Sequence, residues 1–505
     1  MTAPDVARHA AGRRLLNAYL RETGVYDVPL GPFAVPLPAT GGTLPVEVVY
    51  VSPSGHHDYG DLPDELTAAV LAELEASTGH RAAATLGAQI EGSVAHTARF
   101  LARGRRAPSG DLTRHSEQNI LFGHPFHPTP KSSEGFSECD LDSFAPELGV
   151  TFVPHYFAVA RELVIQRGCG EWDPEEVLAA TPSGYAPLPA HPWQARYLLR
   201  NPMVRKLADE GGLISLGALG PRVYPTSSVR TVCASDHATS WKLPLHVRIT
   251  NFVRNTPLEH LARAMDAAAV VAHLPPQDGF GVVRETGYRV VDPAVIGDDL
   301  AAELNVLYRE NPAAGDGPAP RVLAGLLDDP DELVRCVRQA GDVVEWLRCF
   351  VTIAHRPLLS AFAVDGVSFE AHVQNSLLCL DGGRPVRFLV RDLEGVAISR
   401  SRVRHGELPA DSPALYDDAE AWLRLRYHAF TNQLAHVIHV LGRYTDAGER
   451  LLWTVAREEL SGRPEAADLL DCPTLPAKAN LVSRFTGRGE HPLFVDIPNP
   501  LRELP

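Results

Sequence analysis

The sequence predicts an α+β protein built from three successive parts. Residues 1–105 are mainly helical, because Ala and Leu recur at helical spacing over residues 5–22 and 63–104. Residues 106–300 carry short apolar runs between loops rich in Pro, Gly and His, a pattern typical of a β-rich part. Helical patterns return after the turn-rich segment NPAAGDGPAP, and short strands among them predict a mixed α/β part over residues 301–505.

Several individual elements follow from local patterns. The stretch DPDELVRCVRQAGDVVEWLRCFVTIAHRPLLSAF predicts a long helical region that begins at an N-cap aspartate and carries an apolar stripe. The other elements are strands at 46–51, 150–154, 243–249, 369–379 and 386–391, and a helix at 415–442.

Composition excludes several classes of protein. The 505 residues are 45% hydrophobic and 22% charged, which is typical of a globular chain with a full core. The net charge of -15 argues against nucleic acid as a partner, since phosphate neutralisation requires a basic face. A cluster of cations in so acidic a protein therefore favours a small anionic ligand.

The expected location is the cytoplasm. The seven cysteines form no CxxC pair, which suits reduced thiols better than a disulfide framework. The first residues, MTAPDVARHAAGRRLLNAYL, lack the apolar core of a signal peptide, and no stretch approaches a membrane span. We expect neither a membrane nor a nucleic acid as partner.

The segment KLPLHVRITNFVR, residues 242–254, places four basic side chains close together. Its odd positions from 243 to 249 are apolar and its even positions are mostly polar, so it predicts a half-buried strand. The polar face would carry Lys242, His246, Arg248 and Thr250, with Arg254 close behind. These cations would repel one another unless an anion neutralises them.

A hydroxyl-rich turn lies just upstream, in YPTSSVRTV at 224–232. Ser227, Ser228, Arg230 and Thr231 combine hydroxyls with a guanidinium, a set that suits phosphate oxygens. A simple polar strand end is the alternative interpretation. The chain has no GxxxxGK[ST], GxGxxG or GxSxG motif, so a nucleotide site here would be of a less common kind.

An acidic counterpart occurs in FEAHVQNSLL and FLVRDLEGV. In a strand, Glu370, His372 and Gln374 would share one face, and the second strand delivers Asp392 and Glu394 at its end. Carboxylates and amides at neighbouring strand ends can hold a magnesium ion that bridges nucleotide phosphates. The alternative is a buried, internally paired polar layer.

The loop SEQNILFGHPFHPTPKSSEGF, residues 116–136, contains two histidines and a lysine. His124 and His127 have metal-like spacing, but the prolines favour an extended loop and no further ligands are evident. A zinc site, substrate-contacting histidines and simple loop packing are all open. Lys131 is close enough in sequence to reach the same anionic ligand. The similar LPAHPWQ segment at 188–194 has a structural role as its default interpretation.

These ordered motifs resemble the NRPS-independent siderophore synthetases, the IucA/IucC (aerobactin-synthetase-like) family. The resemblance rests on GHPFHPTPKSSEGF, LPAHPWQ, SSVRT, KLPLHVRITNFVR, EAHVQN, RDLEG and KANLVSRF, and extends from about residue 116 to the C-terminus. It implies ATP- and Mg²⁺-dependent adenylation of a carboxylate of citrate or a related acid, followed by attack of an amine or alcohol that gives an amide or ester. We expect a homodimer and a cupped-hand architecture of helical thumb, β-rich fingers and kinase-like palm.

The resemblance also implies roles for individual residues. Lys242, Arg254 and His372 are the catalytic candidates, with Arg254 bridging carboxylate and phosphate and His372 either donating to the same oxygen or accepting a proton. ATP would contact Ser227, Ser228, Arg230, Thr231, Lys242, Gln374 and Asp392. The acid and nucleophile would contact His124, His127, Lys131, Thr250, Arg254 and His372. Magnesium would be bound by Glu370, Asn375 and Asp392.

One departure from the family pattern concerns the acid. Family members often carry an arginine two residues after the lysine of the HPxHPxxK motif, whereas Lys131 is followed by Ser132, Ser133 and Glu134. The missing cation and the added carboxylate favour an acid with fewer carboxylates than citrate, or a citrate monoamide.

Two other functions fit parts of the pattern. In a kinase-like phosphotransferase, Glu370, Asn375 and Asp392 would occupy the positions of the catalytic base and the two metal ligands. That alternative replaces the usual base Asp by Glu and leaves the cationic segment 242–254 unexplained. A protein that binds the ligands without turnover is the non-enzymatic alternative.

Overall fold

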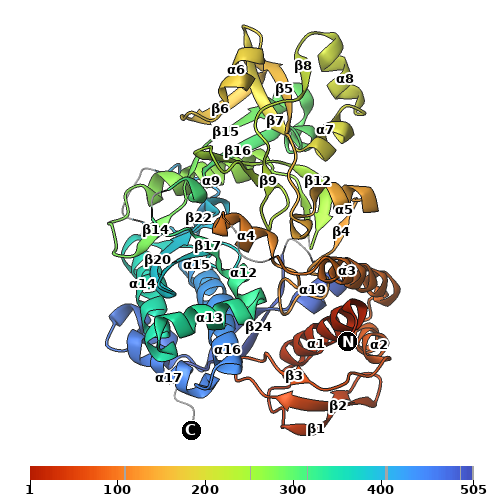
Figure 1. The fold of residues 1–505 in the computed structure, drawn as a ribbon, viewed down its shortest axis with the longest axis vertical. Helices are drawn as coiled ribbons and strands as arrows, with labels where there is room; N and C mark the ends of the chain where they lie inside the picture. Colours follow the sequence, from red (N-terminus) through yellow and green to blue (C-terminus); the bar gives the residue numbers. More distant parts are fainter. Residues whose placement is uncertain (107–109, 251, 316, 404–407, 489–490, 503–505) are drawn as a thin grey trace.

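The computed structural model describes residues 1–106, 110–250, 252–315, 317–403, 408–488 and 491–502. It is a mixed α and β structure in which three regions follow one another along the chain (Figure 1). The first lies at the lower right of the view, the second at the top and the third at the lower left.

The N-terminal region pairs helices with a small sheet. Helix α1 starts at a capping box, in which the Thr2 side chain accepts from the Asp5 backbone and the Asp5 carboxylate accepts in return. The predicted helices and the strand at 46–51 are confirmed, but the sheet has two further strands. The elements are α1 Ala3–Thr23, β1 Gly31–Leu37, β2 Gly42–Tyr50, β3 Asp58–Tyr59, α2 Leu66–Thr78 and α3 Ala83–Arg103.

The middle region is β-rich, and its largest sheet includes β16, which lies beyond residue 300. Its three sheets have the strand orders β6-β15-β16-β11-β10-β9, β7-β5-β8 and β13-β12-β4. The strands are β4 Ser133–Glu134, β5 His155–Ala160, β6 Val164–Gly168, β7 Tyr185–Ala190, β8 Leu213–Ala218, β9 Tyr224–Pro225, β10 Thr231–Cys233, β11 Thr239–Lys242, β12 Leu245–Ile249, β13 Phe252–Arg254, β15 Glu285–Val291 and β16 Asn305–Glu310. The helices are α4 Leu112–Gln118, α5 Glu138–Phe144, α6 Glu175–Ala180, α7 Pro192–Leu198, α8 Pro202–Asp209, α9 Leu258–Val271, α10 Pro293–Ile296 and α11 Asp298–Ala301.

The C-terminal region packs helices on a second sheet, with order β14-β20-β19-β17. Its strands are β14 Phe280–Val282, β17 Arg321–Val322, β18 Val367–Ser368, β19 Ser376–Asp381, β20 Arg384–Val390, β21 Ala397–Ser399, β22 Leu415–Tyr416, β23 Thr474–Lys478 and β24 Phe494–Pro498. Its helices are α12 Leu323–Asp328, α13 Pro330–Ala340, α14 Val343–Asp365, α15 Asp418–Leu425, a π-helical segment Arg426–Leu434, α16 Ala435–Tyr444, α17 Glu449–Leu460, α18 Ala467–Asp471 and α19 Asn480–Phe485.

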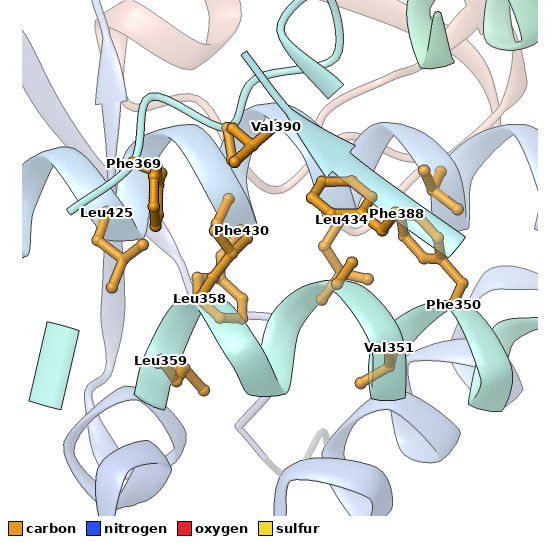
Figure 2. Packing of buried hydrophobic residues seen from close by; sticks show 14 of the residues in the cluster. Phe350, Val351, Leu358, Leu359, Phe369, Phe388, Val390, Leu425, Phe430 and Leu434 are labelled. Atoms are coloured by element: carbon orange, nitrogen blue, oxygen red, sulfur yellow. The ribbon is translucent and has the colours of Figure 1, made fainter. Parts of the chain in front are cut away.

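Helix α14 is the centre of the C-terminal core. The expectation that no stretch approaches a membrane span is wrong by length and composition, because this helix is apolar enough to cross a membrane. However, 56% of its most apolar window is buried inside the protein. Phe350 and Leu358 of this helix lie against Phe388 of β20 and Phe430 of the π-helical segment (Figure 2). Burying such large side chains contributes about 1.5–3 kcal/mol each. The apolar side chains of α14 therefore pack in the core of the C-terminal region.

Two strand predictions are wrong in position. The expected strand at 150–154 contributes only a bridge between Phe152 and Val223, and the regular strand β5 begins afterwards at His155. Residues 370–375 form a turn between β18 and β19 and not the start of a strand. Their apolar and polar alternation still holds, because Ala371 and Val373 are buried in the core.

Candidate active site

A cavity of about 2130 Å³ lies where the three regions meet. Its walls include residues of α1, of strands β10 to β13 in the middle region, and of the turn 370–375 in the C-terminal region. Nearly all the predicted site residues line it: His124, His127, Ser227, Ser228, Arg230, Thr231, Lys242, Thr250, Arg254, Glu370, His372, Gln374, Asn375 and Asp392. Lys131 is not among them.

The segment 242–254 folds differently from the single strand that its alternation predicts. Lys242 ends β11, which pairs with β10 and β16, whereas β12 and β13 belong to another sheet. Within β12 the alternation is as expected, with Leu245 and Val247 buried and His246 and Arg248 half-buried. Pairing of β12 with β13 sets Leu245 opposite Arg254. The cations thus reach one cavity from two sheets.

Arg254 is a buried cation with unused hydrogen-bonding capacity. Its Nη2 donates to Ile249 O and Thr250 Oγ1, each at 2.9 Å, while its Nε is buried without a partner. No acidic side chain of the described residues forms an ion pair with it. Burial, and then the charge of Arg230, lowers the pKa of Arg254 to about 10. A substrate anion would satisfy this guanidinium.

The turn 226–231 displays hydroxyls and backbone groups toward the cavity. Val229 has φ 66°, a left-handed conformation that is unusual for a β-branched residue and indicates a constrained turn. Thr226 Oγ1 lies 3.0 Å from Ser228 Oγ, which also accepts from the Thr231 backbone at 3.1 Å. Arg230 is anchored by donating to Thr256 Oγ1 at 2.9 Å.

The acidic wall is neutralised by cations from the middle region. Lys242 Nζ lies 2.6 Å from both Asp392 and Glu394, and Arg309 Nη2 lies 3.0 Å from Asp392. Burial disfavours ionisation of Asp392, but the charges of Lys242 and Arg309 outweigh it and hold the pKa of this carboxyl below its usual range. By contrast, burial raises the pKa of Glu370.

Gly395 makes room for the Glu370 carboxylate. A Cβ added at Gly395 would lie 1.8 Å from Glu370 Oε2, so any side chain there would displace the carboxylate. This contact explains the glycine of the RDLEG motif. Asp392 itself has φ 74°, so the chain turns sharply after β20 to present this acid to the cavity.

The protonation of His372 follows from its backbone contacts. Its Nδ1 accepts from the backbone N–H groups of Gln374 and Asn375, at 3.2 and 3.3 Å. Burial, and then the charge of Lys478, lowers the pKa of His372 to about 4, so the ring is neutral at pH 7. Since Nδ1 is the acceptor, Nε2 carries the proton. His372 therefore presents a hydrogen-bond donor.

Only part of the loop 116–136 lines the cavity: His124 and His127 do, whereas Lys131 does not. His124 contacts Asn432 Nδ2 through its Nε2 at 3.0 Å, and the Nδ1 of His127 accepts from the Thr129 backbone. Lys131 instead turns to Glu147, with its Nζ 2.6 Å from Oε1, and donates to Ile120 O. The sequence expectation that Lys131 reaches the anionic ligand does not match this geometry, because the lysine already has a nearly buried counter-ion.

The described residues contain no group of three or more His, Cys, Asp or Glu side chains that could hold a metal ion. The pair His124 and His127 therefore has no third ligand of these types beside it among the described residues. The expected magnesium ligands Glu370, Asn375 and Asp392 would not form such a group, because Asn375 contributes an amide oxygen and not a carboxylate.

Comparison with known proteins identifies relatives over the whole chain. A model described as IucA / IucC family matches residues 112–328, and one described as Ferric iron reductase FhuF-like transporter matches residues 344–493. The L-2,3-diaminopropanoate–citrate ligase of Staphylococcus aureus (strain NCTC 8325 / PS 47) is 35% identical to this chain, over 98% of this chain and 96% of the relative. The chain belongs to the IucA/IucC family.

Other members of the IucA/IucC family agree over similar lengths. The spermidine-citrate ligase of Bacillus anthracis is 27% identical over 99% of this chain and 98% of the relative. Among solved structures, ATP-bound aerobactin synthetase IucA of Klebsiella pneumoniae has a TM-score of 0.83, 23% identity, and coverage of 98% of this chain and 100% of its own. At that identity the match establishes a shared fold.

Sequence reasoning missed several cavity residues of this family member. Arg309 lies on β16 in no recognisable motif, although it neutralises Asp392. Lys478 ends β23 and its Nζ lies 5.0 Å from the Tyr427 ring centroid, whereas the motif KANLVSRF by itself predicts no role for this lysine. The π-helical segment brings Tyr427, His428 and Asn432 to the cavity, and such segments often occur at functional sites. No sequence signal distinguishes it from an ordinary helix.

Glu117 and Arg391 form a buried ion pair that connects two walls of the cavity. Glu117 also accepts from the Ser227 backbone at 2.9 Å and from its hydroxyl at 2.8 Å. Gln374 Nε2 donates to the same hydroxyl at 3.2 Å. The hydroxyl turn and the 370–375 turn are thereby fixed relative to each other.

Proposed function

We propose that this chain is an ATP-dependent ligase. It adenylates a carboxylate of citrate or a related di- or tricarboxylic acid and joins the acyl group to an amine or hydroxyl nucleophile, as in siderophore biosynthesis. The names of its relatives support this reaction, since they include ligases of citrate with L-2,3-diaminopropanoate and with spermidine. The observation that carries the proposal is a single cavity in which cations from the middle region lie opposite carboxylates from the C-terminal region.

The cations suit the first step. Attack of a carboxylate on the α-phosphate brings two anions together, so fixed positive charge must offset their repulsion. Arg254 offers a buried Nε without a partner and would bridge the carboxylate and the phosphate. Ser228, Arg230 and Lys242 would contact the phosphates, with Ser227, Thr231 and Gln374 completing this wall.

His372 would act as a hydrogen-bond donor in this step. Its two backbone contacts at Nδ1 leave the proton on Nε2. Of the two roles that the sequence allows, donation to the reacting carboxylate oxygen fits this tautomer, whereas acceptance of a proton at Nε2 does not. Thr250 and the loop residues His124 and His127 would contact the organic acid.

The donor set on the acidic wall fits a magnesium ion. Glu370, Asn375 and Asp392 supply oxygen ligands, which are the type that Mg²⁺ prefers, and Gly395 leaves space beside the Glu370 carboxylate. When bound, Mg²⁺ neutralises charge on the triphosphate. We assign Glu370, Asn375 and Asp392 as ligands of Mg²⁺, and Asp392 also as a contact of ATP.

The products test the reaction class. We expect pyrophosphate when the enzyme is given ATP, Mg²⁺ and citrate or a citrate analogue, AMP once an amine or alcohol is added, and a hydroxamate when hydroxylamine replaces that nucleophile. A matrix of di- and tricarboxylates against amines, amino acids and amino alcohols then identifies the pair of substrates. Formation of ADP and a phosphoester would overturn the proposal in favour of a phosphotransferase.

The remaining expectations are part of the same proposal. We assign the chain to the cytoplasm and propose a homodimer whose subunits each close thumb, fingers and palm around the cavity. Light scattering coupled to gel filtration tests the oligomeric state, and a monomer at micromolar concentration would contradict it.

A further inference from the structure

The cavity extends into the N-terminal region, where sequence reasoning placed no function. This end is lined by Arg13, Arg14 and Asn17 of α1, by His56 and His57 in the loop before β3, and by His436 and His439 of α16. Asn17 Nδ2 donates to His57 O at 2.9 Å, so α1 and the histidine loop form one wall.

Proton counting fixes the tautomer of His56. Ser52 Oγ donates to the Glu449 carboxylate at 2.9 Å, which uses its only proton. In the contact of 3.0 Å between Ser52 and Ser54, the donor must therefore be Ser54 Oγ. Ser54 then has no proton left for His56 Nδ1, which lies 2.9 Å away, so the imidazole Nδ1–H is the donor. In a neutral ring, Nε2 is consequently a bare acceptor.

That acceptor is buried on the cavity wall without a partner. His56 is only 5% exposed, and its Nε2 makes no hydrogen bond to any described residue. Burial, and then the nearby His439 and His436, hold the pKa of His56 well below its usual range, so the ring is neutral at pH 7. Stacking on His439, at 4.7 Å between centroids, and edge contact with Phe126, at 4.6 Å, hold the ring in place.

The same wall carries a buried cation, Arg14, whose nearest acidic influence is Asp328 and which forms no ion pair among the described residues. Arg14 is 6% exposed, and among the described residues its guanidinium donates from Nη1 to Phe122 O at 3.1 Å. No acidic side chain in the described part of the chain forms an ion pair with it, whereas its neighbour Arg13 is paired with Asp58 at 2.5 Å. Burial, and then the charge of Arg13, lowers the pKa of Arg14 to about 10. A buried guanidinium without an ion pair would be stabilised by an anionic group of a bound ligand.

A short chain of contacts joins this end to the reacting end. Asn432 Oδ1 accepts from the Val373 backbone, next to His372, at 3.2 Å, and Asn432 Nδ2 contacts His124 at 3.0 Å. His124 is close enough to both His372 and His436 for each to lower its pKa after the effect of burial. The N-terminal end is therefore continuous with the place where the acyl group would be activated.

We propose that this end of the cavity binds the nucleophile, that the nucleophile is an amine bearing a carboxylate, and that His56 Nε2 accepts its proton while Arg14 binds its carboxylate. The inference rests on the proposed ligase function. In the second step, the amine nitrogen forms a bond to the acyl carbon and the bond from that carbon to the AMP oxygen breaks. AMP leaves with the electron pair. An alkylammonium loses two protons in all: His56 Nε2 accepts the first, which frees the nitrogen lone pair for attack, and the second, lost as the amide forms, passes to water.

The variant His56→Phe tests the acceptor while keeping a flat ring for stacking. Hydroxylamine is uncharged at neutral pH, so its nitrogen attacks without first losing a proton to His56, and hydroxamate formation should stay within about threefold of wild type. Amide formation with a protonated amine should fall at least about 100-fold, and the loss should shrink as the pH rises. Ser54→Ala, which frees the tautomer, should cause a smaller loss. Equal losses in both assays, or an amide rate that is unchanged, would overturn the role of His56.

The variant Arg14→Met tests the carboxylate site, with the exposed Arg8→Met on the same helix as its matched control. The probes are three amino acids, L-2,3-diaminopropanoate, L-ornithine and L-lysine, each paired with the diamine that lacks its carboxylate. Wild type should prefer an amino acid over its diamine. Arg14→Met should raise KM for that amino acid at least about 10-fold and leave KM for the diamine and for the organic acid unchanged. Arg8→Met should match wild type.

The outcomes separate this inference from the proposed function. Absence of hydroxamate from wild type with every organic acid would reject the ligase itself. Hydroxamate formation together with a preference for diamines, or an Arg14→Met effect on KM of the organic acid alone, would reject only the nucleophile site. A readout independent of turnover is the ¹⁵N spectrum of the histidines, in which the signal lost in His56→Phe should show a protonated Nδ1 and a bare Nε2.

Discussion

Lys242 Nζ lies 2.6 Å from Asp392 Oδ1 and joins two regions of the protein across the active-site cavity. The lysine ends β11 of the middle sheet, and the aspartate follows β20 of the C-terminal sheet. Only 4% of the lysine side chain is exposed. This pair therefore fixes the cations of the middle region relative to the proposed magnesium ligands of the C-terminal region.

Replacement of Lys242 should affect both stability and activity. Lys242→Met leaves Asp392 and Glu394 without their closest cation, and removing one partner of a buried ion pair costs about 3 kcal/mol. We expect a lower Tm and a loss of pyrophosphate release of at least about 100-fold. Thermal unfolding and a coupled pyrophosphate assay measure the two effects. The exposed Lys206→Met is the control, and a variant equal to it would show that the pair is dispensable.

Arg254 and His372 should be required for activation of the acid. Arg254→Ala removes the guanidinium with the unpartnered Nε, and His372→Ala removes the Nε2 donor. Each should reduce hydroxamate formation by at least about 100-fold, because each group would stabilise charge in the transition state. Far-UV circular dichroism checks the fold. Trapping at the wild-type level by either variant removes that residue from the catalytic set.

Lys131 is expected to be structural. Its pair with Glu147 is nearly buried, since the side chains are 10% and 9% exposed. Lys131→Met should lower the free energy of unfolding by about 3 kcal/mol and leave KM for the organic acid within about twofold. Urea denaturation and initial-rate kinetics measure both quantities. A rise in KM of the acid without a change in stability would instead support the substrate contact that the sequence suggested.

Gly395→Ala should weaken the metal site. The added methyl would collide with Glu370 Oε2, so the carboxylate must turn away. The methyl would also lie 2.9 Å from Glu370 Cβ, so the turn must shift together with the carboxylate. We expect a loss of stability of about 1–3 kcal/mol. We also expect an increase in the Mg²⁺ concentration for half-maximal rate of at least about 10-fold. Titration of the rate with Mg²⁺ provides the measurement. An unaltered Mg²⁺ dependence would argue against Glu370 as a ligand.

The buried His355 should make stability depend on pH. Burial lowers its pKa from 6.5 to about 4, so between these values the unfolded chain binds a proton that the folded protein does not. Stability should therefore fall as the pH drops from 6.5 to 4, by up to about 3 kcal/mol from this group. Urea unfolding of His355→Phe should show a shallower decline than wild type over that range. Parallel curves would contradict this assignment.

The sequence predicted the position of a side chain correctly where neighbours in the sequence decide that position. The alternation in LHVRI predicted which side chains of β12 are buried, and the acids after β20 were found at the cavity as expected. It failed where neighbours in sequence separate in space. Lys242 belongs to a different sheet from Arg248, because Leu243 and Pro244 lead the chain from β11 to β12.

Residues without a local pattern could not be found from the sequence. Arg309 lies on an ordinary buried strand, and only the pairing of β16 with β11 brings it to Asp392. Arg14 and Asn17 repeat along one face of α1 in a way that resembles a solvated helix face, yet both are buried. A long-range contact decides each case, and periodicity carries no information about such contacts.

Helix α19, the last helix of the described residues, completes the core of the first region. Leu481 and Phe485 of α19 are buried among side chains of α1, α2 and α3, and the Glu22 carboxylate accepts from the Leu481 and Val482 backbone. During synthesis, the N-terminal region must wait for residues made some 400 positions later before its interior can close. A nascent chain would thus keep an open apolar surface until residues 480–485 have been made, and a truncation that removes them would leave the core of the first region incomplete.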